Sequence, residues 1–238
     1  MRLALDAPRG GDDVFVGGES VYRTSLAAQD DNRSMTILLM RHGETALNAA
    51  RVLQPEDTPL SAVGRRQAEA LARRVALLAP AALVSSDLPR AWQTALAIAG
   101  TAGLQVLSQP LLRERNFGDL RGQPYDCLPA DRLAMSQAPP GGESAAEFEQ
   151  RVALAFAQLL RLRAEVEGTL AVVTHGLVIQ ALLARHASVR DGGSESVGLA
   201  NASLTIVEAQ PPHTVTLLGC TRHIDTAAPG STGSLHGG

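Results

Sequence analysis

The stretch "LLMRHGETALN", residues 38–48, decides the fold class that this chain is expected to adopt. An apolar run ends abruptly there, and Arg41 and His42 stand side by side before Gly43. Short, continuous apolar runs are typical of strands that are buried on both faces of a parallel sheet. The stretch therefore predicts a strand over residues 35–40 that delivers a guanidinium and an imidazole to the edge of a sheet.

Strands and helices alternate along the rest of the chain. Further strands are predicted at 81–86, 104–109 and 169–175, and two closing strands at 202–209 and 213–220. Helices are predicted from the cap Ser61, from about Asp87 to near Gly100, from the capping box Ser144–Glu147, and over 176–186. This alternation predicts an α/β fold, a three-layer α/β/α sandwich with a mainly parallel central sheet.

Two of these helices show apolar residues at helical spacing, which marks the faces expected to pack against the sheet. The residues of these faces are Val63, Leu71, Val75 and Leu78 in the first helix, and Phe148, Val152, Phe156 and Leu159 in the third.

The composition bounds the class of protein. The chain has 238 residues, is 45% hydrophobic and carries a net charge of −3, so it can bury a core and lacks the basic face that nucleic acid requires. Its 21 basic residues are all arginine, which excludes Schiff-base enzymes and sites built on a phosphate-binding lysine. The two cysteines form neither a disulfide framework nor a complete metal site, and a cytoplasmic location is expected.

The two ends of the chain differ from the middle. Residues 1–34 are rich in Gly, Asp and Ser and are expected to form a poorly ordered extension, with Met35 as a candidate for the native start. Residues 225–238 have low complexity and are expected to form a flexible tail, which leaves one domain over 35–224. No apolar stretch reaches the length of a membrane span, and the first residues do not resemble a signal peptide.

Three of the predicted strands end in residues that can carry chemistry. The first delivers Arg41 and His42, the second is followed by Asp87 and Arg90, and the fourth delivers His175 where a helix begins. Because the carboxyl ends of parallel strands meet at one edge of a sheet, these groups are expected to lie together beside two helix N-termini. Two arginines, two histidines and free backbone N–H groups predict a pocket for a phosphate dianion.

A histidine in such a pocket has a ring nitrogen that can attack phosphorus while the arginines stabilise the equatorial oxygens. This chemistry needs neither a metal nor an organic cofactor, and none is predicted. A leaving alkoxide requires a proton, and Glu114, on the loop after the third strand, is the candidate acid. Whether this carboxyl keeps its proton near the cationic groups depends on its burial and on the bound phosphate.

The segments "RHGETALN", "SSDLPRAWQTA", "LLRERNFGDLRG", "GGES" and "VVTHG" resemble, in this order, the motifs of the histidine phosphatase superfamily, in its phosphoglycerate-mutase-like branch. The resemblance covers about Met35 to Ile224. It implies an α/β sandwich and a phosphohistidine mechanism. His42 would be the phosphorylated nucleophile and Glu114 the acid and base, and the phosphate pocket around them would consist of Arg41, Arg90 and His175.

The remaining matched residues are expected to contact or support the phosphoryl group. Thr45 and Asn48 match positions that commonly touch it, and Gly176 and Leu177 would offer backbone contacts. Arg115 is expected to bind substrate. The residues expected to brace the site, as a helix cap or from behind the phosphate-binding groups, are Asp87 and Glu143.

The superfamily contains mutases and phosphatases, and the catalytic residues do not separate them. The mutases that this chain resembles carry a long, basic insertion between the acid/base glutamate and the "GES" segment, whereas here Glu143 follows Glu114 by only 29 positions. A short connection leaves the pocket open to water, which favours a phosphatase of the histidine acid type that hydrolyses a small phosphorylated metabolite. A cofactor-dependent phosphoglycerate mutase and a non-catalytic phospho-ligand-binding relative are the alternatives.

The chain departs from its relatives at Gln54-Pro55, where many have a Gln-Gly turn. Proline fixes φ and removes an N–H donor, so this loop is expected to take another shape and to alter substrate contacts. A serine hydrolase is disfavoured because the chain has no G-x-S-x-G motif. The expected partner is the substrate alone, without nucleic acid or membrane, and the protein is expected to be a monomer or a homodimer.

Overall fold

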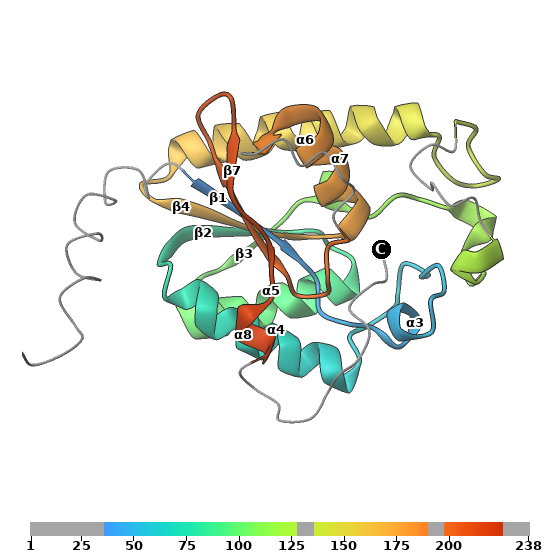
Figure 1. Ribbon diagram of the computed structural model, residues 1–238, viewed down its shortest axis with the longest axis horizontal. Helices are drawn as coiled ribbons and strands as arrows, with labels where there is room; N and C mark the ends of the chain where they lie inside the picture. The colour runs from blue at the N-terminus through green and yellow to red at the C-terminus, as the bar shows by residue number, and fades with distance from the viewer. Residues whose placement is uncertain (1–35, 128–135, 190–197, 226–238) are drawn as a thin grey trace, which may run out of the picture. The chain divides into compact units, whose positions relative to one another are not determined.

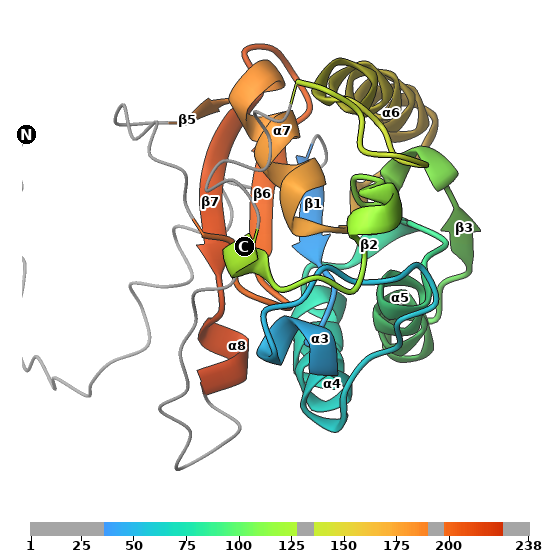
Figure 2. The same ribbon diagram turned by 90° about the vertical axis from the view of Figure 1, so that its right-hand side faces the viewer.

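The computed structural model describes residues 36–127, 136–189 and 198–225, which Figure 1 shows as coloured ribbons. The predicted extension over 1–34, the candidate start at Met35 and the tail beyond Asp225 lie outside the described residues. Within the described ranges, a central sheet is covered by helices on both faces (Figure 1, Figure 2). The predicted three-layer α/β/α sandwich is therefore confirmed.

The described part of the sheet has seven strands. They are β1 (Thr36–Arg41), β2 (Pro80–Ser85), β3 (Val106–Ser108), β4 (Thr169–Thr174), β5 (Ser188–Val189), β6 (Leu204–Glu208) and β7 (Thr214–Cys220). Their order across the sheet is β3-β2-β4-β1-β6-β7-β5. The first four pair in parallel, β6 is antiparallel to β1 and β7, and β5 is parallel to β7. The sheet is thus mainly parallel, as predicted.

Helices pack on both faces of this sheet. The α-helices in the described ranges are α3 (Ala46–Ala49), α4 (Ala62–Ala76), α5 (Pro89–Ala102), α6 (Ala145–Glu165), α7 (Gly176–His186) and α8 (Arg222–Asp225). Between β3 and Cys127 the described chain forms three short 3₁₀ helices, namely η1 (Pro110–Leu112), η2 (Gly118–Leu120) and η3 (Tyr125–Cys127). Figure 2 shows α6 and α7 on one side of the sheet and α4 and α5 on the other. No helix in the described ranges combines the length and apolar composition that a membrane crossing requires.

Burial on both faces explains why β1 and β4 are apolar along their length. Ile37 and Leu39 belong to the core on the α6 and α7 side, whereas Leu38 and Met40 belong to the core on the α4 and α5 side. Every residue of β4 is buried. Because successive side chains of a strand point to opposite faces, a sheet covered on both sides requires a continuous apolar run.

One predicted core residue is wrong, because Val63 is 40% exposed. The helix begins behind Ser61, whose side chain accepts a hydrogen bond from the Gly64 N–H at 2.9 Å. The buried stripe, at positions i, i+4, i+7 and i+11, consists of Gly64, Ala68, Leu71 and Val75. Val63 precedes this stripe by one residue, a rotation of about 100° around the helix, and so faces solvent.

Several predicted boundaries differ from the observed ones by one or two residues, and two of these differences have a clear physical cause. Helix α5 continues through Gly100 and ends at Ala102, where Gly103 adopts a φ of 69° and caps the helix. The left-handed conformation after a helix favours glycine, whereas glycine inside a helix is tolerated, so Gly103 is the stop signal. The third predicted strand, 104–109, is shortened to Val106–Ser108, because β3 lies at the edge of the sheet and pairs with β2 through three residues.

Candidate active site

The carboxyl ends of β1 and β4 place two histidines next to each other. Arg41 is paired with Thr174 in the parallel ladder, and the backbone N–H of His42 donates to the Thr174 carbonyl oxygen at 3.0 Å. His175 follows Thr174, so the register of the strands brings both imidazoles to the same edge of the sheet. Their ring centroids lie 5.1 Å apart, and both side chains are buried.

The imidazole of His42 is held in one tautomer. Its Nδ1 lies 2.7 Å from the carbonyl oxygen of Gly43. A carbonyl oxygen only accepts hydrogen bonds, so Nδ1 carries the ring proton and Nε2 keeps a lone pair. Burial lowers the pKa of His42 well below the ordinary histidine value, and the charges of Arg90 and Arg41 lower it further. His42 is therefore neutral, with Nε2 in the form that can act as a nucleophile.

Close packing fixes the loop that carries His42. A Cβ at Gly43 would lie 2.4 Å from the carbonyl oxygen of Gly64 in α4, so this position requires glycine. From another direction, the amide of Asn201 donates to the carbonyl oxygen of His42 at 3.2 Å and to Oδ1 of Asn48 at 3.1 Å. His42 is thus anchored both through its own backbone and through its neighbours.

Two arginines, Arg41 and Arg90, bring positive charge close to His42. Arg41 lies against Gly176, where a Cβ would be 3.5 Å from the arginine Nε. Arg90, in the first turn of α5, is 2% exposed and donates to the carbonyl oxygen of Pro55 at 3.3 Å. Burial lowers the pKa of Arg90 to about 10, so this side chain keeps its charge near neutral pH.

His175 is fully buried, and its Nε2 lies 2.8 Å from Oγ of Ser86. Burial lowers the pKa of His175 well below the ordinary value, and the charge of Arg90 lowers it further. In the described part of the chain, Nδ1 of His175 has no hydrogen-bond partner, and neither do Nε of Arg90 and Nδ2 of Asn48. Buried polar atoms are normally hydrogen-bonded. Of these three residues only Arg90 lines the cavity that His42 and Glu114 also line, and there a ligand oxygen can supply the missing partner.

Glu114 approaches from the loop that follows η1. Its carboxyl oxygens accept hydrogen bonds from the Arg115 N–H at 3.0 Å and the Leu177 N–H at 3.3 Å. Burial raises the pKa of the Glu114 carboxyl, while these two N–H groups and the charge of Arg90 act in the opposite direction. Because burial is the largest of these effects, Glu114 holds its proton more tightly than an exposed glutamate does, which suits a proton donor.

Thr45 and Asn48 form a reciprocal cap at the start of α3. Oγ1 of Thr45 accepts from the Asn48 N–H at 3.0 Å, and Oδ1 of Asn48 accepts from the Thr45 N–H at 3.2 Å. The Thr45 hydroxyl also donates to Oε1 of Gln54 at 2.8 Å, which ties the Gln54-Pro55 turn to this cap. Neither Thr45 nor Asn48 is among the residues that line the cavity. Their expected contact with the phosphoryl group stays a prediction.

Three other residues that were expected to contact the substrate, Gly176, Leu177 and Arg115, line the cavity. Gly176 and Leu177 lie at the start of α7, but the N–H of Leu177 is already bonded to Glu114. Arg115 is 3% exposed, and its guanidinium carbon lies 5.4 Å from the centroid of the Phe117 ring. The structure thus places all three beside Glu114.

The two residues expected to brace the site act through arginines. Asp87 caps no helix, since the N-cap of α5 is Leu88, so that alternative is wrong. The Asp87 carboxylate instead pairs with Arg113, whose Nε lies 2.7 Å from Oδ1. Glu143 accepts hydrogen bonds from Arg151 at 2.6 and 3.1 Å.

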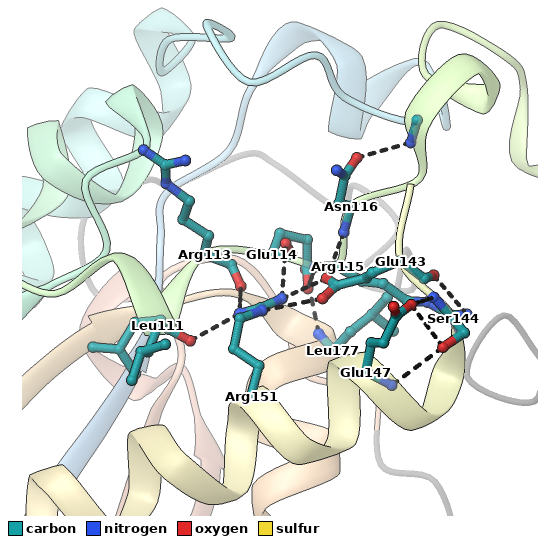
Figure 3. Close-up of polar contacts among 12 residues, drawn as sticks. Leu111, Arg113, Glu114, Arg115, Asn116, Glu143, Ser144, Glu147, Arg151 and Leu177 are labelled. Carbon is teal, nitrogen blue, oxygen red and sulfur yellow. Dashed lines mark hydrogen bonds and ion pairs between the residues drawn. The ribbon is translucent and has the colours of Figure 1, made fainter. Parts of the chain in front are cut away.

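Arg151 of α6 connects Glu143 with the loop that carries Glu114, as Figure 3 shows. Its guanidinium donates to three backbone carbonyl oxygens of that loop, those of Leu111 and Arg113 at 2.8 Å each and that of Glu114 at 3.4 Å. On the other side of the loop, Oε1 of Glu143 accepts from the Asn116 N–H at 2.8 Å. One ion pair therefore holds the position of the candidate acid.

The sequence alone did not point to Arg151, Ser86 or Asn201. Arg151 follows the buried Phe148 by three positions, and a charged residue on the core face of a helix is a signal that it has a partner. Ser86 lies within the "SSDLPR" motif. No comparable signal marks Asn201, because its partner His42 lies 159 residues away in the sequence.

Arg41, His42, Arg90 and Glu114 line one cavity of about 370 Å³, which falls within the usual size of small-molecule sites. His175, like Thr45 and Asn48, is not among its lining residues. We call Arg41, His42, Arg90 and Glu114 its inner wall. Its outer wall is formed by loops and by α6, and the charged side chains there, apart from Arg115, are Glu56, Arg113, Arg121, Glu143 and Arg151. No group of three or more His, Cys, Asp or Glu side chains in the described ranges is arranged to hold a metal ion.

Residues 37–219 match the family described as the histidine phosphatase superfamily, branch 1. The chain belongs to this superfamily. The resemblance seen in its motifs is thereby confirmed, and the fold agrees with it. Superfamily members are phosphatases or mutases, so the chain is a phosphoryl-transfer enzyme.

Relatives within the superfamily carry both kinds of name. A protein of Yersinia enterocolitica named probable phosphoglycerate mutase GpmB is 37% identical over 186 residues, covering 74% of this chain and 86% of the relative. The structure of mycobacterial glucosyl-3-phosphoglycerate phosphatase with VO3 is 33% identical, has a TM-score of 0.63 and covers 73% of this chain and 91% of that one. A structure named mycobacterial hydrolase 1 is 31% identical, with a TM-score of 0.64, over 77% and 96% of the two chains.

Proposed function

We propose that this chain is a metal-independent phosphomonoester hydrolase of the histidine acid type that acts through a phosphohistidine on His42. The observation that carries the proposal is the state of that imidazole. Its Nδ1–H is directed to the Gly43 carbonyl oxygen at 2.7 Å, which leaves Nε2 unprotonated. His42 shares its cavity with two arginines and with Glu114, whose pKa burial raises.

In the first step, Nε2 of His42 attacks phosphorus, and the bond between phosphorus and the ester oxygen breaks. Glu114 transfers its proton to the departing oxygen, so the leaving group is an alcohol. Arg41 and Arg90 stabilise the negative charge on the equatorial oxygens of the transferring group, and His175 supports them from behind His42.

In the second step, a water molecule attacks the phosphorus of the phosphohistidine. Glu114, now a carboxylate, accepts a proton from this water as the new oxygen–phosphorus bond forms. The nitrogen–phosphorus bond breaks, and inorganic phosphate leaves. His42 is again neutral, Glu114 is again protonated, and the enzyme is ready for another ester.

The short connection between Glu114 and Glu143 supports water as the acceptor of the second step, because no long insertion is available to cover the cavity. A mutase is the second candidate, favoured by the 37% identity to the protein named probable phosphoglycerate mutase GpmB. A mutase would return the phosphoryl group to a bound phosphoglycerate instead of water. A binding protein without activity is less favoured, because none of the five expected catalytic residues is missing.

A panel of phosphomonoesters tests the proposal, with p-nitrophenyl phosphate and 3-phosphoglycerate among them and EDTA present. We expect phosphate release from several esters at rates that EDTA does not change. Isomerisation of 3-phosphoglycerate without phosphate release would instead identify a mutase. Loss of all activity in EDTA would contradict metal independence, and silence across the panel would favour the binding protein.

A further inference from the structure

Three arginines at the outer wall of the cavity are each matched with a carboxylate. The three ion pairs are Arg113–Asp87, Arg121–Glu56 and Arg151–Glu143, the last two with nitrogen–oxygen distances of 2.6 Å. These six side chains carry three positive and three negative charges. Their charges therefore sum to zero.

The Glu56–Arg121 pair acts on both walls, Glu56 on Arg113 and Arg121 on Arg90. The hydrogen bond with Asp87 is the main cause that raises the pKa of Arg113, and the charge of Glu56 adds to it. Burial is the main cause that lowers the pKa of Arg90, and the charge of Arg121 is a smaller one. The Glu56–Arg121 pair is thus within electrostatic range of the group expected to hold the phosphate.

The inner wall has a different balance of positive and negative charge. Arg90 donates to a backbone carbonyl oxygen and forms no ion pair within the described ranges. Arg41 and Arg90 together carry two positive charges, which match the two negative charges of a phosphate dianion. Arg115 also lines the cavity, and it is 3% exposed, lies over the Phe117 ring and donates to the Glu143 carbonyl oxygen at 3.4 Å.

We infer that the substrate is a phosphate ester of an uncharged alcohol, without a carboxylate or a second phosphate beyond the ester; this inference rests on the proposed hydrolase function. A second anion at the outer wall would have to displace a carboxylate that the protein already provides. An uncharged group meets paired polar side chains there and can also bury apolar surface. The apolar side chains of this wall include Leu53, Leu88, Leu111, Phe117 and Tyr125.

Glycerol 3-phosphate and 3-phosphoglycerate form a matched pair of probes. Both are three-carbon monoesters of a primary alcohol, and they differ at the far carbon, which carries a hydroxyl in one and a carboxylate in the other. We expect kcat/KM of the wild type to favour glycerol 3-phosphate by about tenfold, the order of effect of one charge interaction near a protein surface. A preference for 3-phosphoglycerate would overturn the inference.

Glu56→Gln should release Arg121 and shift the ratio of the two kcat/KM values toward 3-phosphoglycerate by about fivefold or more. Glu149→Gln is the control, because Glu149 pairs with Arg185 at the same 2.6 Å and neither residue lines the cavity. If the ratio of the two kcat/KM values were the same in Glu56→Gln as in Glu149→Gln, the inference would be wrong.

Hydrolysis of p-nitrophenyl phosphate separates this inference from the proposed function. An enzyme that hydrolyses this ester yet prefers 3-phosphoglycerate would remain a phosphatase, and only the uncharged substrate class would be wrong. An enzyme that fails to hydrolyse it and isomerises 3-phosphoglycerate would contradict both.

Discussion

The inner and outer walls of the cavity use the same residue, arginine, in two ways. On the inner wall, Arg90 is buried against the carbonyl oxygen of Pro55 and keeps its charge for a ligand. On the outer wall, Arg121 and Arg151 are each bonded to a glutamate at 2.6 Å. This difference is the basis of the inferred preference for a phosphate ester of an uncharged alcohol.

Removal of the nucleophile from the inner wall should have the largest effect. His42→Ala should lower kcat/KM for p-nitrophenyl phosphate by about 10⁴ or more, the order seen when a catalytic nucleophile is removed. His186→Ala is the matched control, since His186 stacks on Phe156 at the end of α7 and lies outside the cavity wall. A His42→Ala enzyme within tenfold of the wild type would contradict the assigned role.

Glu114→Gln should have the next largest effect, and its size should depend on the leaving group. Alkyl esters need a proton on the departing oxygen, so formation of phosphohistidine from them should slow by about 10²–10⁴. Formation of phosphohistidine from p-nitrophenyl phosphate should slow far less. Single-turnover kinetics would measure both. Equal losses for the two kinds of ester would show that Glu114 does not donate the proton.

The pH dependence of kcat/KM tests the same two groups through their pKa values. The active form requires neutral His42 and protonated Glu114. Because burial lowers the pKa of His42, its acid limb should lie below the ordinary histidine range; because burial raises the pKa of Glu114, the alkaline limb should lie above the ordinary carboxyl range. Glu114→Gln should remove the alkaline limb, and survival of that limb would assign it to another group.

The inner wall could be predicted from the sequence because its residues follow directly from strands. Arg41 and His42 stand where an apolar run ends, and parallel pairing brings such ends together whatever the loops do, as it also does for the neighbouring His175. Arg90 is fixed by the first turn of the helix after β2. Local signals therefore determined most of this wall.

The outer wall could not be predicted in the same way, because its contacts join segments that are far apart. Arg151 bonds to carbonyl oxygens 37 to 40 residues earlier, and Arg121 pairs with Glu56 across 65 residues. The error at Val63 has a related cause. The buried stripe of α4 begins at Gly64, which packs against the backbone of Gly43 and Glu44, and a glycine gives no apolar signal in the sequence.

A direct comparison of the walls replaces one arginine from each. Arg90→Gln should lower kcat/KM for glycerol 3-phosphate by about 10²–10³, as the loss of one charge-stabilising donor does in other sites. Arg121→Gln should change it by less than about fivefold, because Arg121 already has Glu56 as its partner. Thermal unfolding of both variants would show whether lost stability accounts for the difference. Similar kcat/KM losses in two folded variants would remove the distinction between the walls.

Arg151→Ala should have a smaller effect than Arg90→Gln, about tenfold on kcat, because it loosens the loop that positions Glu114 without touching the phosphate. The loss should be greater for alkyl esters than for p-nitrophenyl phosphate, with KM little changed. Arg185→Ala, which breaks the exposed Arg185–Glu149 pair, is the control. A drop in thermal stability with no dependence on the leaving group would reduce Arg151 to a purely structural role.

The central claim, that His42 carries the phosphoryl group, is tested most directly by trapping the intermediate. The Glu114→Gln enzyme should accumulate the phosphohistidine from p-nitrophenyl phosphate. The p-nitrophenolate departs without a proton, whereas the water that attacks the phosphohistidine still needs a base. After an alkaline quench and cleavage at arginine, mass spectrometry should find the phosphoryl group on the peptide His42–Arg51. A phosphoryl group on His175, or continued turnover with no phosphorylated peptide, would contradict the mechanism.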